Sequence, residues 1–116
     1  IDIVLDTFPF PGGTTTAEAL WMGVPTITLS GDTLIARQGE SMMRCVGLSE
    51  WVAYSQADYV RIAVDMAADT ATLTQLRLRL RDLARQSPLY DAVLFAHHLT
   101  LALRAMALKH RVVGDD

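Results

Sequence analysis

The chain has 116 residues and a mass of 12.7 kDa, which is enough for one domain and too little for two lobes with separate cores. Hydrophobic residues make up 51% of it and charged residues 20%, which excludes disordered, collagen-like and low-complexity chains. The formal charge of −3 is not that of a nucleic-acid-binding domain, which needs a dominant basic face. Because the sequence shows no signal peptide and no apolar run of about 18 residues, we expect a cytoplasmic protein that does not bind a membrane.

The first half of the chain predicts alternating strands and helices. A β-branched run is followed by a loop rich in Pro and Gly, and then by a run of helix-forming residues that ends at Gly23. We expect strands over residues 1–5, 25–29 and 51–54, and helices over residues 14–22 and 33–46. Strand, helix and strand in this order form a βαβ unit, which predicts a parallel sheet.

The second half of the chain predicts helices only. Ser55 and Asp58 have the spacing of a capping box, in which a hydroxyl and an acidic residue close the start of a helix. We expect helices over residues 55–68, 70–86 and 91–110. The last of these carries His97 and His98, but no Cys or carboxylate stands at metal-ligand spacing from them, so no metal site is expected.

Several single residues carry structural expectations. Cys45, Trp21 and Trp51 are expected to be packed in the core, and a lone cysteine excludes an internal disulfide. Asp6, at the end of the first strand, is expected to hold the amides of the loop that follows. Arg37 is expected to form an ion pair with a nearby carboxylate. The candidates for that partner are Asp32 and Glu40.

The clearest chemistry lies in the loop between the first strand and the first helix. Gly12 and Gly13 allow a close approach to the backbone, and the helix start beyond them offers unpaired N–H groups beside the hydroxyls of Thr14 and Thr15. Such a helix start at the carboxyl end of a parallel strand suits a phosphate. Glu18 follows one turn later, where a carboxylate can accept hydrogen bonds from ribose hydroxyls.

The same loop also has a purely structural interpretation. The glycines would make a turn, the threonines would cap the helix, and Glu18 would stabilise its first turn through the helix dipole. The loop matches neither the dinucleotide-binding GxGxxG pattern nor a Walker loop, so its glycines alone do not decide between the two interpretations.

A longer stretch, which includes this loop, reads LDTFPFPGGTTTAEALWMGVPTITLSGDTLIARQGESMMRCVGLSEWVA. It resembles the distal catalytic lobe of the O-linked N-acetylglucosamine transferase family, in particular its bacterial members that follow tetratricopeptide repeats. These are the family 41 glycosyltransferases, and the resemblance implies a Rossmann-like α/β half-lobe of a GT-B enzyme, with a short parallel sheet followed by helices. Residues 1–54 would be the nucleotide-sugar-binding βαβ part and residues 55–116 the C-terminal helices of one incomplete domain.

The resemblance also implies roles for individual residues. Thr14 and Thr15, with Gly12 and Gly13, would hold the diphosphate of UDP-N-acetylglucosamine, and Glu18, where the animal enzymes have Asp, would bind the ribose. Gly13 stands where the animal enzymes have a His, which leaves the donor sugar open. The implied reaction is inverting sugar transfer to Ser or Thr hydroxyls of an acceptor protein or peptide, without a metal or another cofactor, and no catalytic residue is assigned within the segment.

Alternatives stay open at this point. Family members differ in donor and acceptor, so transfer of glucose to Asn or of fucose from a GDP sugar is also consistent, and so is a non-catalytic interaction module on the same fold. We expect an N-terminal catalytic lobe, a Lys that binds the diphosphate and tetratricopeptide repeats upstream, which agrees with the absence of Lys and Arg from residues 1–36. The isolated chain is expected to bind UDP weakly, to be inactive and to self-associate through apolar surface.

Overall fold

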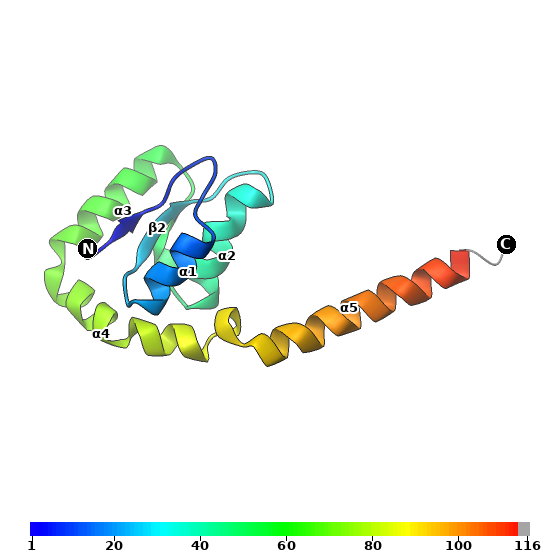
Figure 1. Cartoon of the computed structure of the whole chain (residues 1–116). Coiled ribbons are helices and arrows are strands. Elements are labelled where there is room, and N and C mark those ends of the chain that lie inside the picture. Colours follow the sequence, from blue (N-terminus) through cyan, green and yellow to red (C-terminus); the bar gives the residue numbers. More distant parts are fainter. Residues whose placement is uncertain (114–116) are drawn as a thin grey trace.

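A computed structural model describes residues 1–113 of the chain, and the side chains of residues 1–110. Three short parallel strands form one sheet in the order β1-β2-β3 (Figure 1). They are β1 (Val4–Leu5), β2 (Thr26–Leu29) and β3 (Val52–Ala53). Val4 lies opposite Thr26, and Thr28 lies opposite Val52. All three predicted strands are confirmed, each shorter than its apolar run.

Five α-helices and three short 3₁₀ turns connect and follow the strands within the described residues. The helices are α1 (Thr14–Trp21), α2 (Gln38–Cys45), α3 (Gln56–Ala68), α4 (Thr70–Gln86) and α5 (Ala92–Val113). The 3₁₀ turns are η1 (Ile35–Arg37), η2 (Ser49–Trp51) and η3 (Pro88–Tyr90). The helix predicted over residues 33–46 is therefore split into η1 and α2, and the others agree with their predicted positions within a few residues.

The helix ends explain why the elements stop where they do. Gly23 has a φ of 73°, a left-handed conformation that ends α1 as predicted. At the start of α3, the Ser55 hydroxyl accepts a hydrogen bond from the Asp58 N–H at 3.1 Å, which is half of the predicted capping box. The predicted start of α1 was wrong in two respects. No threonine side chain caps the helix, whose N-cap residue is Gly13. Because the helix begins at Thr14, Glu18 lies in its second turn and not in its first.

The core lies between the sheet and the helices on its two sides. Helices α1 and α2 pack against one side and α3 against the other, while α4 crosses below and contacts both α1 and α3 (Figure 1). The largest fully buried apolar side chains are those of Leu20, Ile27, Met43 and Leu80. Trp51, 2% exposed, belongs to the same cluster as predicted.

Two core predictions were wrong. Trp21 is 37% exposed, because it lies on the outer side of α1, where its ring packs against Tyr90 and under the guanidinium of Arg81. Cys45 is exposed at the last position of α2, on the side of the helix that faces away from the buried Met43. Apolar residues close to them in sequence are buried instead, Leu20 beside Trp21 and Met43 and Val46 near Cys45.

Helix α5 leaves this body and extends along the longest dimension of the molecule, which measures 63 × 29 × 18 Å (Figure 1). Large apolar side chains along it are exposed, among them Val93, Phe95 and Met106. Among the described residues no helix is both long enough and apolar enough to cross a membrane.

Candidate functional site

Asp6 anchors the loop that carries the predicted site residues. It follows β1 directly and is 6% exposed. Its Oδ1 accepts hydrogen bonds from the N–H groups of Gly12 at 2.7 Å and Thr7 at 3.0 Å, and its Oδ2 accepts one from the hydroxyl of Thr28 at 2.8 Å. One carboxylate therefore ties both ends of the loop to the next strand, which confirms the role predicted for Asp6.

A buried tyrosine fixes Asp6 from the opposite side of the sheet. The hydroxyl of Tyr59, on α3, donates a hydrogen bond of 2.7 Å to the main-chain oxygen of Asp6. Burial raises the pKa of Tyr59, and the nearby charge of Asp6 raises it further. No local sequence pattern predicts this contact, since the two residues are 53 positions apart in the chain and only the fold brings them together.

Gly12 and Gly13 let the loop pack tightly against its surroundings. A Cβ atom on Gly12 would lie 2.5 Å from Oγ1 of Thr15, and one on Gly13 would lie 2.5 Å from Nε2 of Gln38, at the start of α2. At Gly12 the Cβ would also meet the buried Thr16 hydroxyl at 2.8 Å, so a larger residue there would force the packed loop to shift. At Gly13 the atom met is the end of the flexible Gln38 side chain, which can move aside. The space that a side chain at either position would fill is thus taken by other residues of this chain. Gln38 therefore lies beside the predicted site.

The start of α1 presents donors at the carboxyl end of β1. The first main-chain hydrogen bond of the helix runs from the Ala17 N–H to the Gly13 oxygen at 3.1 Å, so the N–H groups of the preceding three residues have no partner within the helix. Thr14 and Thr15 are exposed there, whereas the hydroxyl of Thr16 is buried and donates back to Gly12. The structure therefore brings together exposed hydroxyls, unpaired amides and the positive end of a helix.

Glu18 lies on the same side of α1 as Thr14, one turn further along. Both line an open hollow of about 470 Å³, which we call the α1 hollow. Ala17, Trp21, Met22 and Tyr90 complete it, and the Trp21 and Tyr90 rings lie 5.3 Å apart. Of the residues predicted to bind the diphosphate, Thr14 thus shares this hollow with Glu18, which is predicted to bind the ribose, whereas Gly12, Gly13 and Thr15 do not line it.

A second hollow of about 440 Å³ lies at the carboxyl end of β2, and we call it the strand-end hollow. It is lined by Phe8 and Pro9 of the anchored loop, residues 29–33, Ala36 and Gln56. Arg37 lies next to it, but the predicted ion pair is wrong. Its Nε instead donates to the main-chain oxygen of Gly31 at 2.9 Å, which holds the turn after β2, and no carboxylate within the described residues pairs with it.

Beside the strand-end hollow, Glu40 joins three elements. It accepts hydrogen bonds from Ser30 after β2, from Tyr54 after β3 at 3.0 Å, and from Nε of Arg44 at 2.9 Å. The hydrogen bond from Ser30, followed by those from Tyr54 and Arg44, lowers the pKa of Glu40 against the opposing effect of burial. Glu40 is therefore ionised near neutral pH and holds the ends of two strands together.

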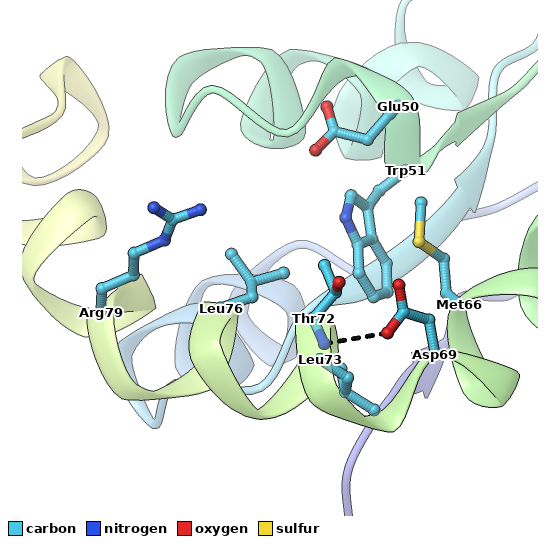
Figure 2. Close-up of a pocket in the computed structure, with 8 residues that line it drawn as sticks. All are labelled: Glu50, Trp51, Met66, Asp69, Thr72, Leu73, Leu76 and Arg79. Atoms are coloured by element: carbon cyan, nitrogen blue, oxygen red, sulfur yellow. Dashed lines mark hydrogen bonds between the residues drawn. The ribbon is translucent and has the colours of Figure 1, made fainter.

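A third hollow, of about 190 Å³, lies at the other end of the sheet, before β3 (Figure 2). Figure 2 shows Trp51 in the middle of its lining, with Arg79 away from both Glu50 and Asp69. Asp69 accepts a hydrogen bond of 3.0 Å from the Thr72 N–H as the cap of α4. Interaction with the Thr72 side chain, and then with its N–H, lowers the pKa of Asp69. None of the predicted site residues lines this third hollow.

The chain forms an open parallel α/β sheet, with the anchored loop and the strand-end hollow at the carboxyl ends of its strands, which is where folds of this kind bind their ligands. Comparison with known proteins names the family. Residues 1–99 match the family described as glycosyl transferase family 41, and the chain belongs to that family. Relatives in plants and in an animal are named as probable or established UDP-N-acetylglucosamine–peptide N-acetylglucosaminyltransferases, so the predicted glycosyltransferase family is confirmed.

Individual relatives show how much of the chain is shared. A protein of Eustoma exaltatum subsp. russellianum, named "Probable UDP-N-acetylglucosamine–peptide N-acetylglucosaminyltransferase SPINDLY", is 48% identical over 100% of this chain. The UDP-N-acetylglucosamine–peptide N-acetylglucosaminyltransferase of Caenorhabditis elegans is 32% identical over 84% of this chain. The chain spans 12% of the first relative and 8% of the second.

A solved structure confirms the fold. The structure of an O-GlcNAc transferase mutant from Thermobaculum terrenum matches with a TM-score of 0.84 and 42% identity. The match covers 91% of this chain and 20% of that one. The α/β fold, with a short parallel sheet and following helices, is therefore that of part of an O-GlcNAc transferase.

Proposed function

We propose that this chain is the part of an inverting glycosyltransferase that binds the UDP of UDP-N-acetylglucosamine for transfer of the sugar to Ser or Thr hydroxyls of proteins. The observation that carries the proposal is the start of α1, where exposed Thr14 and Thr15 and unpaired N–H groups lie at the carboxyl end of β1. The names of the relatives, which are peptide N-acetylglucosaminyltransferases, support the same donor and acceptor.

In this proposal α1 stabilises the leaving group. As the bond between the sugar C1 and the phosphate oxygen breaks, negative charge grows on the β-phosphate of UDP. The amides and hydroxyls of Thr14 and Thr15, together with the helix dipole, interact more strongly with that charge in the transition state than with the bound donor. Gly12 and Gly13 place the helix start, and these donors meet the charge without a metal ion or other cofactor.

Glu18 is assigned to the ribose. Its carboxylate lies on the same side of α1 as Thr14, so a nucleotide whose phosphates contact the helix start would extend along the α1 hollow. Ionised carboxylates are acceptors only, which suits the two ribose hydroxyls. No catalytic acid or base is assigned within this chain.

The remaining parts of the enzyme are proposals of the same kind. We propose that residues 1–54 are the nucleotide-sugar-binding part and residues 55–116 the C-terminal helices of one lobe. A second catalytic lobe and tetratricopeptide repeats would lie elsewhere in a cytoplasmic protein. The isolated chain would then bind UDP weakly and transfer no sugar.

The proposal is tested by nucleotide binding in the full-length protein that carries this chain. We expect UDP to raise its Tm, and Thr14→Val combined with Thr15→Val to weaken UDP binding about 10- to 100-fold, since donors to a charged group are lost. Thr74→Val, on the exposed side of α4, is the matched control and should leave UDP binding unchanged.

Other outcomes distinguish the alternatives. Glu18→Ala should weaken UDP without changing the fold, and equal affinities would return Glu18 to a structural role. A Tm shift with GDP but not UDP would replace the donor by a GDP sugar, such as GDP-fucose. Product analysis separates O-linked N-acetylglucosamine from glucose on Asn. No shift with either nucleotide would leave a non-catalytic interaction module.

A further inference from the structure

The third hollow is separate from the proposed nucleotide site, and we call it the Trp51 hollow. It lies before β3, whereas the start of α1 lies at the carboxyl end of β1, so the two are at opposite ends of the parallel sheet. Its lining comes from η2, the end of α3 and the first half of α4, and it shares no residue with the α1 hollow or the strand-end hollow. A molecule bound there would not overlap UDP at the start of α1.

Trp51 places an unpaired hydrogen-bond donor in this hollow. The residue is 2% exposed, and its indole N–H has no hydrogen-bond partner among the described residues. Among those residues, the unpaired side-chain atoms that solvent cannot reach are limited to Oγ1 of Thr26, so the indole nitrogen is reachable from the hollow. Figure 2 shows this nitrogen on the side of the ring that faces Leu76 and Arg79. Because a buried indole N–H normally has an acceptor, the hollow offers a place for an acceptor atom of a ligand.

Charged groups of both signs surround the indole. Figure 2 shows Arg79 on one side of it and Asp69 on the other, with Glu50 above. None of these three side chains forms an ion pair within the described residues. Asp69 uses Oδ1 as the cap of α4, which leaves Oδ2 free. The guanidinium and the indole N–H can therefore donate to an anionic oxygen, while the two carboxylates can accept from an ammonium group.

The rest of the lining is apolar and the space is small. Leu76 is buried in the core cluster, and Met66 and Leu73 pack against it. The volume of about 190 Å³ is below the roughly 300–1,000 Å³ of sites for drug-sized ligands. At about 30 Å³ for each water-sized group, it holds roughly six such groups. A matching ligand is therefore small, carries both charges and has a short apolar part.

We propose that the Trp51 hollow binds a free α-amino acid with a short aliphatic side chain, such as alanine or valine. Its carboxylate would accept hydrogen bonds from Trp51 and Arg79, and its ammonium group would donate to Asp69 and Glu50. Its side chain would pack against the apolar lining. A zwitterion is favoured over a simple cation or anion because groups of both signs line the hollow without partners of their own. The inference does not depend on the proposed function.

The test is calorimetric titration of the full-length protein that carries this chain. We expect L-alanine and L-valine to bind, and L-tryptophan, which is too large for the space, not to bind. N-acetyl-L-valine lacks the ammonium group and L-valinamide lacks the carboxylate. Each should therefore bind at least about 10-fold more weakly than L-valine, since interactions with one charged group are lost.

Single substitutions assign the binding to this hollow. Arg79→Gln and Asp69→Asn should each weaken L-valine about 10-fold, and Asn is itself a favoured N-cap residue, so α4 keeps its cap. Trp51→Phe removes the N–H but keeps an aromatic ring, and should weaken L-valine about 3- to 10-fold. Arg85→Gln and Asp82→Asn, which change exposed residues of α4 outside the hollow, are the matched controls and should leave the Kd of L-valine unchanged.

The contrary results are distinct. If neither L-alanine nor L-valine bound, or if L-valine bound equally well to the wild type and to all three hollow variants, the inference would be overturned. N-acetyl-L-valine or L-valinamide binding as tightly as L-valine would also overturn it, because a site that disregards one charge does not select a zwitterion. A protein that bound L-valine in this hollow but neither UDP nor GDP would keep this inference and lose the proposed function.

Discussion

Residues 1–90 and helix α5 differ in where their apolar side chains go. In the α/β body, α4 buries Leu76, Leu80 and Ala84 against the sheet and its other helices. In α5, large side chains such as Leu101, Leu103 and Leu108 are half or more exposed. The body therefore contains the partners for its own apolar residues, whereas α5 does not. Within the described residues α5 therefore depends mainly on helix propensity, and its apolar side chains form an exposed surface without a partner.

The largest expected loss of stability comes from the buried side of α4. Leu80→Ala removes a fully buried side chain and should lower the free energy of unfolding by about 2–5 kcal/mol. The matched control is Leu78→Ala on the same helix, where the side chain is 75% exposed and the change should stay within about 0.5 kcal/mol. Urea denaturation followed by circular dichroism measures both, and similar values for the two variants would contradict the buried core of the body.

A smaller effect is expected at the anchor of the loop. Asp6→Ala removes the acceptor of two N–H groups and of the Thr28 hydroxyl, and should cost about 1.5–3 kcal/mol in the same measurement. Asp6→Asn keeps one acceptor oxygen and should lose less. If both variants unfolded like the wild type, the loop would not depend on Asp6 for its conformation.

A third effect concerns Glu40, whose contribution to the stability of the body should depend on pH. Because the folded-state pKa of Glu40 lies below its ordinary value of 4.5, its ionised form stabilises the body above about pH 4.5, and this contribution is lost as the pH falls through the folded-state pKa. The stability difference between the wild type and Glu40→Gln should therefore be present at pH 7 and shrink toward pH 3. Thermal unfolding across that range measures it, and a difference independent of pH would exclude the ionised interaction.

The smallest effect on the stability of the body is expected from α5. Leu101→Gln combined with Leu108→Gln should change the unfolding of the α/β body by less than about 0.5 kcal/mol. The same pair should reduce self-association of the isolated chain, which sedimentation velocity detects. A wild-type chain that remained a stable monomer would contradict the expectation that α5 presents an unsatisfied apolar surface.

The alternation of short apolar runs with glycine-terminated helices predicted the fold well. Gly23 and Ser55 act through their nearest neighbours in sequence, so their roles could be recognised without the structure. Exposure was harder to predict, because it depends on which side of a helix faces the sheet. Trp21 and Cys45 are apolar residues among apolar residues, and only the rotation of α1 and α2 places them outside the core.

The part of the candidate site that is formed by residues close in sequence was also predictable. Thr14, Thr15 and Glu18 are close in sequence, and the position of the loop after a strand indicates the binding edge of the sheet. Asp32 and Gln56, which line the strand-end hollow, are separated from that loop in sequence and come together only because β2 and β3, which they follow, are parallel neighbours. The signal that could have found them is their position, since each follows shortly after the end of a strand.

The position of β1 at the edge of the sheet has a consequence for amide hydrogen exchange. The N–H groups of Val4 and Asp6 are bonded to Pro25 and Ile27, so that of Leu5, between them, points away from β2. In the isolated chain Val4 and Asp6 should therefore exchange slowly and Leu5 quickly. In a longer protein, slow exchange at Leu5 would reveal that another strand has joined this edge and extended the sheet.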